Sequence, residues 1–169
     1  EHDKDDDHDH EKHDDHDEDD HGEVDPHVWL DPENAKAMVH EIEEALAKAD
    51  PANAATYESN AEAVMAKLDS LVAEIDSELQ PVKGRGYIVF HDAYQYFENR
   101  FDISVLGALT VNTDVLPGAE QLSEIREVIE HENVNCIFSE PQFNPDIINA
   151  ITMDTNVKTG ILDPLGATL

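Results

Sequence analysis

Short apolar runs alternate with helical patterns over residues 81–169. Four segments are typical of strands, and the three segments between them are typical of helices. The strand segments are 87–90, 103–111, 136–138 and 157–162, and the helical segments are 94–101, 119–132 and 146–153. Strands that are separated by helices pair in parallel through crossover connections. The alternation therefore predicts an α/β domain with a mainly parallel sheet.

A long helical pattern precedes this alternation. Its apolar residues recur every three or four positions, as they do on one face of a helix. They are Val64, Leu68, Leu71, Ile75 and Leu79. A helix over residues 52–79 has a length of about 42 Å at about 1.5 Å per residue, which is enough to bridge two lobes. Asp-Pro pairs at 31–32 and 50–51 predict a shorter helix ahead of it.

The charge of the chain is strongly negative. There are 40 Asp and Glu residues against 10 Lys and Arg residues, which gives a formal net charge of −30 with histidine neutral. This charge argues against nucleic acids and anionic membranes as partners, because binding their phosphates needs clusters of basic side chains. A cationic partner, including a metal ion, suits this charge.

Residues 1–22 form a low-complexity tract of Asp, Glu and His with two lysines and a glycine. The tract contains no apolar residue, so burial cannot offset the entropy lost on ordering, and we expect it to be disordered. Its histidines are His2, His8, His10, His13, His16 and His21. One interpretation is a solubilising acidic linker, and the other is a low-affinity tract that collects metal ions.

Candidate metal ligands follow the predicted strands. Ligands of open parallel sheets bind outside the carboxyl ends of the strands. His91 directly follows the first strand and Asp163 the fourth, while His27 lies in a turn before the first helix. Two imidazoles and a carboxylate suit zinc, although each residue also fits a turn or capping role. We expect Glu140 and Tyr94 to support the ligands rather than to bind metal themselves.

Enzyme signatures are absent from the sequence. It contains no H-E-x-x-H, G-x-S-x-G, G-x-x-x-x-G-K-[ST] or G-x-G-x-x-G motif. No apolar run approaches the length of a membrane span. Cys136 is the only cysteine, so no disulfide forms within this sequence. These observations favour a binding protein over an enzyme.

Five motifs in a fixed order resemble those of the ZnuA-type periplasmic zinc-binding proteins, the solute receptors of zinc ABC importers. They are D-P-H-V-W-L-D-P (25–32), V-F-H-D-A-Y-Q-Y-F (89–97), P-G-A-E-Q-L (117–122), S-E-P-Q-F (139–143) and L-D-P-L-G (162–166). A His- and Asp-rich tract precedes the first motif. The resemblance covers essentially the whole chain.

The resemblance implies a two-lobe metal-receptor fold in which a long helix links two α/β lobes and zinc lies between them. Residues 1–22 then form the metal-collecting tract, 23–51 the end of the first lobe, 52–80 the helix between the lobes, and 81–169 most of the second lobe. Most of the first lobe and the extreme C-terminus of such a receptor are expected to lie outside this sequence.

The resemblance also implies the ligands. His27 and His91 match ligands of the family, Asp163 is the carboxylate that binds zinc directly or through water, and a further histidine belongs to the first lobe. Cys136 matches one half of a disulfide that some members close. Relatives that carry manganese have Glu in place of His91, and imidazole favours zinc over manganese.

The expected function is high-affinity zinc capture in the periplasm by a monomer that delivers Zn²⁺ to the membrane permease of a zinc ABC transporter. A lipid anchor at the outer face of the membrane is the alternative location. The alternative functions are a manganese or iron receptor, a zinc buffer, or an adhesin of the same fold. A metallohydrolase fragment is the less favoured alternative, with His27, His91 and Asp163 as catalytic ligands and Glu140 as general base.

Overall fold

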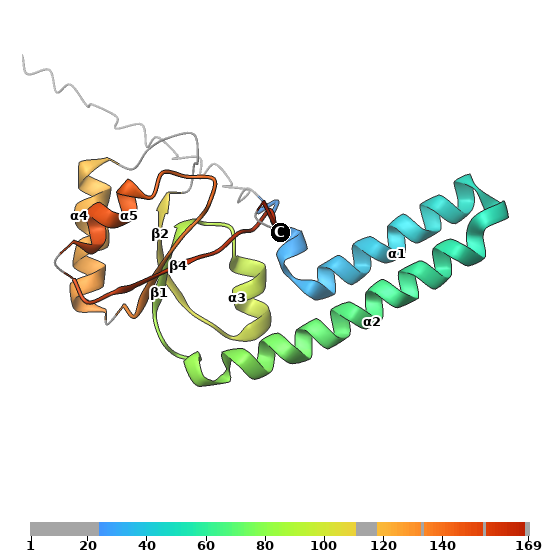
Figure 1. The fold of residues 1–169 in the computed structure, drawn as a ribbon, viewed down its shortest axis with the longest axis horizontal. Helices are drawn as coiled ribbons and strands as arrows, with labels where there is room; N and C mark the ends of the chain where they lie inside the picture. Colours follow the sequence, from blue (N-terminus) through green and yellow to red (C-terminus); the bar gives the residue numbers. More distant parts are fainter. Residues whose placement is uncertain (1–23, 111–117, 133, 154, 168–169) are drawn as a thin grey trace, which may run out of the picture.

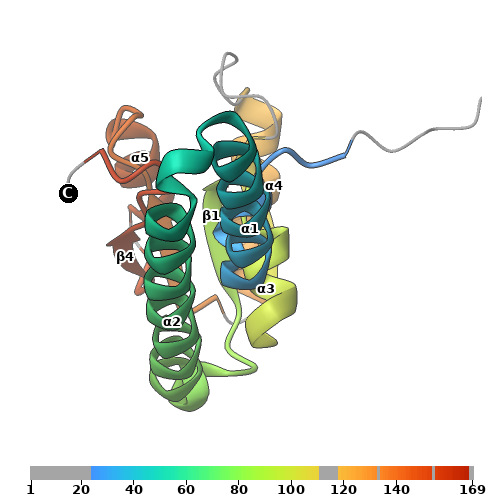
Figure 2. The same ribbon diagram turned by 90° about the vertical axis from the view of Figure 1, so that its right-hand side faces the viewer.

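The computed structural model describes residues 24–110, 118–132, 134–153 and 155–167 (Figure 1). The predictions for the acidic tract therefore lie outside the described residues. The described chain consists of a helical hairpin followed by an α/β domain. The hairpin projects away from the sheet (Figure 1), and its two helices pack side by side (Figure 2).

Proline residues set the boundaries of the hairpin helices. A short 3-10 helix, η1 (Val28–Leu30), leads into α1 (Pro32–Ala49), which has proline at its first position. A second 3-10 turn, η2 (Pro51–Asn53), connects α1 to α2 (Ala54–Leu79). The 26 residues of α2 correspond to about 39 Å. A third turn, η3 (Gln80–Val82), then leads to the sheet. The predicted long helix is thus confirmed as one unbroken element.

Within the described ranges, four parallel strands form one sheet in the order β2-β1-β3-β4. They are β1 (Tyr87–His91), β2 (Val105–Thr110), β3 (Cys136–Ser139) and β4 (Lys158–Ile161). Their connections contain α3 (Gln95–Phe101), α4 (Ala119–His131) and α5 (Asp146–Thr152). The predicted α/β class and parallel sheet are confirmed. The strand order reverses at β1, because the chain passes from β1 to β2 on one side and then returns to β3 on the other.

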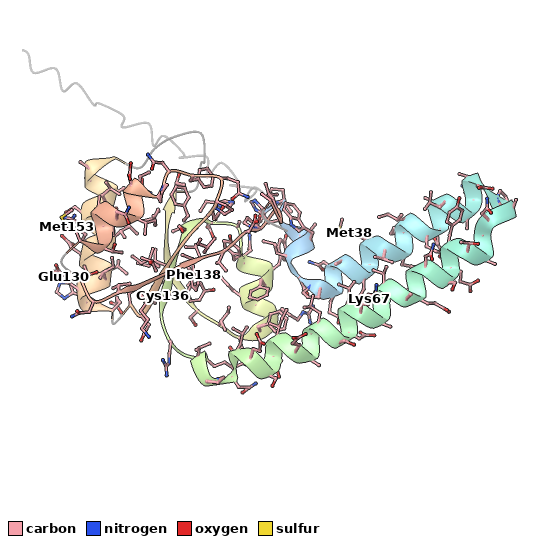
Figure 3. All side chains as sticks on the ribbon, in the orientation of Figure 1. Met38, Lys67, Glu130, Cys136, Phe138 and Met153 are labelled. Atoms are coloured by element: carbon pink, nitrogen blue, oxygen red, sulfur yellow. The ribbon has the colours of Figure 1, made fainter. Side chains whose placement is uncertain are left out.

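The two faces of the sheet carry separate clusters of apolar side chains. Ile88 and Phe90 of β1 pack with residues of α4 and α5 in the larger core, which includes the fully buried Ile137 of β3. Val89 points to the opposite face and packs with Ala93 and Tyr94 near α3. This division follows from the twofold alternation of side chains along a strand. In Figure 3, Glu130 and Met153 lie on the α4 and α5 side, away from the hairpin.

The α3 side of the sheet also contains an apolar cavity of about 590 Å³. Cys136 and Phe138 of β3, which Figure 3 labels, line it together with Leu79 of α2 and Val82 of η3. Asp163 also lines it. Among the described residues, no helix is both long enough and apolar enough to span a bilayer.

Asp31 joins the hairpin to the α/β domain. Its carboxylate accepts a hydrogen bond from the Glu33 amide at 2.9 Å, which caps α1. The same carboxylate accepts hydrogen bonds from Nε and Nη2 of Arg100 on α3 at 2.8 and 2.7 Å. Burial raises the pKa of Asp31, but the hydrogen bonds from Arg100 and Glu33 and the positive charge of Arg100 lower that pKa more. The carboxyl is therefore ionised at neutral pH.

We expect Asp31→Ala to reduce the free energy of unfolding by about 1–2 kcal/mol at pH 7, the usual effect of losing a helix cap. Because the pKa of Asp31 is lowered in the folded state, its contribution is present above the unfolded pKa and disappears as the pH falls through the folded pKa. Thermal unfolding from pH 7 to about pH 3 measures this difference. The exposed Asp69→Ala is the control, with a smaller effect. A difference in stability between the wild type and Asp31→Ala that is the same at both pH values would contradict a stabilising role for the charge of Asp31.

Candidate metal centre

His91 is the last residue of β1, at the point where the strand order reverses. Its side chain is largely buried, and Nδ1 lies 2.7 Å from Oε1 of Glu140, which directly follows β3. The hydroxyl of Tyr94 donates to the same oxygen at 3.1 Å. Glu140 is only 3% exposed, so this carboxylate is held between its two partners away from solvent. The crevice at such a reversal is where open α/β sheets bind their ligands.

The carboxylate also sets the chemistry of its neighbours. Burial raises the pKa of Tyr94, and the negative charge of Glu140 raises it further, so the hydroxyl keeps its proton and acts as a donor. An ionised carboxylate can only accept, so we assign the Nδ1 hydrogen of His91 to its bond with Glu140. When the ring is neutral, its free electron pair is then on Nε2.

His27 lies beside His91, on the segment that leads into η1. It immediately precedes η1, and its Nδ1 lies 2.5 Å from Oδ1 of Asp25. Trp29 contacts the His27 ring, with 5.3 Å between the ring centroids, and donates its indole N–H to the carbonyl of Pro164 after β4 at 3.1 Å. The segment that carries His27 is thereby attached to the α/β domain.

The two histidines face each other through Nε2. These nitrogens are 3.4 Å apart, and the ring planes meet at 64°. With both Nδ1 hydrogens directed at carboxylates, two electron pairs point into one small space, which favours a cation there. A tetrahedral zinc ion at about 2.0–2.1 Å from two imidazole nitrogens places them about 3.3–3.4 Å apart. The spacing of His27 and His91 fits that geometry.

Asp163, the third predicted ligand, follows β4 and accepts a hydrogen bond from Nε2 of Gln142 at 2.9 Å. Within the part of the chain that the structure describes, no three His, Cys, Asp or Glu side chains are grouped closely enough to hold a metal. The structure therefore brings together His27 and His91, and Asp163 as a ligand stays a prediction. The tract histidines His2, His8, His10, His13, His16 and His21 lie outside the described residues.

Asp25 is a site residue that the sequence analysis did not select. Burial raises its pKa, but hydrogen bonds from the His27 amide, Gln95 and the His27 side chain lower it more. The carboxylate is therefore ionised beside the imidazole. The available signal was the D-P-H pattern, in which an aspartate two residues before a histidine can turn back onto the backbone of that histidine.

Comparison with known proteins identifies the class to which this fold and site belong. The family model described as "Zinc-uptake complex component A periplasmic" (ZnuA) matches residues 1–169. The chain therefore belongs to the ZnuA family of metal receptors.

Relatives and solved structures agree with this assignment. The chain is 48% identical to the high-affinity zinc uptake system protein ZnuA of Brucella abortus (strain 2308), over 87% of this chain and 44% of that protein. It is 44% identical to the ZnuA protein of Yersinia pestis, over 86% and 46%. The chain thus spans less than half the length of these curated relatives.

Among solved structures, a crystal structure of ZnuA matches with a TM-score of 0.77 and 33% identity, over 85% of this chain and 56% of that one. The laminin-binding protein of Streptococcus agalactiae, titled a bifunctional protein with adhesin and metal transporting activity, matches with a TM-score of 0.77 and 31% identity, over 86% and 56%. The expected metal-receptor fold is confirmed by these likenesses.

Proposed function

We propose that this protein is a zinc receptor that captures Zn²⁺ between His27 and His91. The observation that carries the proposal is the pair of Nε2 atoms 3.4 Å apart, each on a ring whose Nδ1 contacts a carboxylate. Carboxylate–histidine pairs of this kind orient imidazole ligands of zinc. A receptor needs no reacting group beside the metal, so the proposal is a binding protein rather than an enzyme.

The proposed site is shared between two lobes. Asp163 supplies a third donor, directly or through water, and the first lobe supplies a further histidine. Residues 23–51 form the end of that lobe, 52–80 the connecting helix and 81–169 most of the second lobe. The unbroken helix α2 supports the assignment of 52–80 as one connecting helix. Closure of the lobes would complete the coordination, and opening would release the ion.

The partner that we propose is the membrane permease of a zinc ABC importer, to which the protein delivers zinc as a monomer in the periplasm. The description of the matching family and the names of the relatives support this role. We propose zinc rather than manganese or iron as the cargo, because imidazole nitrogens suit zinc whereas manganese prefers carboxylate oxygens.

The acidic tract is proposed to collect zinc near the cleft or to sense high zinc. Its six histidines are interspersed among aspartates, and both residue types bind zinc. A collecting tract binds ions weakly at several points, whereas the cleft binds one ion tightly.

Zinc competition titration tests the proposal directly. The intact protein that carries this sequence is titrated at neutral pH beside a variant that lacks residues 1–22. We expect one tightly bound zinc per chain in both, with additional weak binding only when the tract is present. Loss of the tight zinc on removal of the tract would contradict a cleft site. Weak zinc binding and zinc uptake that are the same with and without residues 1–22 would contradict a role of the tract in collecting or sensing zinc.

A further inference from the structure

Asp25 is held in place by contacts of both its carboxylate and its backbone carbonyl. One carboxylate oxygen, Oδ1, accepts the backbone N–H of His27 at 2.9 Å and contacts its Nδ1 at 2.5 Å. The other oxygen, Oδ2, accepts from Nε2 of Gln95 at 2.7 Å. The backbone carbonyl of Asp25 accepts the hydroxyl of Tyr96 at 3.2 Å. Gln95 and Tyr96 both belong to the first turn of α3, so this helix fixes both the side chain and the backbone of Asp25.

We propose that Asp25 is a positioning residue for zinc capture, which holds the His27 ring in the orientation and tautomer that direct Nε2 toward Nε2 of His91. This inference rests on the proposed zinc function. Asp25 contacts the Nδ1 edge of the ring, whereas Nε2 lies on the far edge, so the carboxylate is not itself a ligand of an ion between the two histidines.

The arrangement repeats, on a different segment, what Glu140 does for His91. Each histidine has a carboxylate at Nδ1, and each carboxylate has a second donor, which is Gln95 for Asp25 and Tyr94 for Glu140. These two donors are adjacent in the chain, at the N-terminal end of α3. The start of α3 therefore connects the supports of both histidines and presets the distance between them. A site preset in this way needs less reorganisation when the ion arrives.

The hydrogen bonds of Asp25 predict different effects for two substitutions, Asp25→Asn and Asp25→Ala. The atom that faces His27 must accept the backbone N–H, so in Asp25→Asn the amide oxygen takes that place and still accepts the Nδ1 hydrogen. The amide nitrogen then faces Gln95, which can turn its own oxygen toward it. Asp25→Ala removes the acceptor altogether. If Asp25 positions the His27 ring, Asp25→Asn therefore retains much of the zinc affinity that Asp25→Ala loses.

Zinc affinity of the intact protein is the first measurement. We expect Asp25→Ala to weaken zinc binding about 10–100-fold, the usual effect of removing such a partner, and Asp25→Asn to weaken it less. Asp50→Ala is the matched control, because Asp50 also accepts two side-chain hydrogen bonds but lies at the far end of the hairpin. Its zinc affinity should equal that of the wild type. Asp25→Ala within twofold of the wild type would overturn the inference.

The second measurement needs no zinc. Nitrogen-15 NMR of the metal-free protein reports which ring nitrogen of His27 carries the hydrogen. We expect the hydrogen on Nδ1 in the wild type and in Asp25→Asn, and a mixture in Asp25→Ala with the folded spectrum otherwise retained. A His27 tautomer that is the same in all three proteins would overturn the inference even if zinc binds between the histidines. If the His27 tautomer changes with the Asp25 substitutions as expected but the protein binds no zinc tightly, the positioning role is upheld and the proposed function is contradicted.

Discussion

Replacing His91 by alanine is expected to weaken zinc binding by more than about 100-fold. Removal of a partner behind a ligand already costs about 10–100-fold, and removal of the ligand itself costs more. His91 supplies one of the two facing Nε2 atoms, and its loss also leaves buried Glu140 with one donor fewer. Competition titration of the intact protein against a chelator measures the change.

His40→Ala is the matched control for this prediction. His40 lies on α1, and its side chain is 58% exposed beside Glu43 and Glu44. A histidine at the surface of the hairpin contributes nothing to a site at the sheet, so its removal should leave the tight affinity unchanged. If His40→Ala and His91→Ala weakened zinc binding equally, or neither did, the site between His27 and His91 would be wrong.

The second large effect is on stability. Ile137→Ala should reduce the free energy of unfolding by about 2–5 kcal/mol, because Ile137 is fully buried in the larger core and its truncation leaves a cavity between β3 and the helices. That loss is a large part of the 5–15 kcal/mol that usually stabilises a domain. Chemical denaturation of the wild type and the variant measures it.

Ile161→Ala is the control on the neighbouring strand. Ile161 occupies β4 and is 70% exposed, so the same truncation removes little buried surface. We expect a change within about 0.5 kcal/mol, as for most surface substitutions. Ile161 lies on the same face of the sheet as Ile137, so an effect of Ile161→Ala as large as that of Ile137→Ala would contradict the difference in burial between the two residues.

The fold was largely predictable because its signals are local. The continuous apolar run at 87–90 is typical of a strand covered on both faces, and the structure has β1 there with Ile88, Val89 and Phe90 buried. The repeat from Val64 to Leu79 predicted α2. The strand order was not predicted, because it depends on contacts between strands that are distant in sequence. Those contacts leave no periodic pattern.

The site was predictable only in part. The rule that ligands bind at the carboxyl ends of strands selected His91 and Glu140, which the structure places 2.7 Å apart. It could not select Asp25, because the role of Asp25 depends on Gln95 of α3, 70 residues along the chain. Asp163 satisfies the same rule as His91, and its carboxylate accepts a hydrogen bond from Gln142. The rule places a residue at an edge of the sheet but does not orient its side chain.

In the proposed site, zinc binds between Nε2 of His27 and Nε2 of His91. Anomalous X-ray scattering at the zinc edge, from crystals of the intact zinc-loaded protein, tests this placement. We expect one strong zinc peak within about 2.0–2.1 Å of both nitrogens, with Asp25 and Glu140 still contacting the Nδ1 atoms. A strong peak elsewhere, with no density between the two histidines, would contradict it.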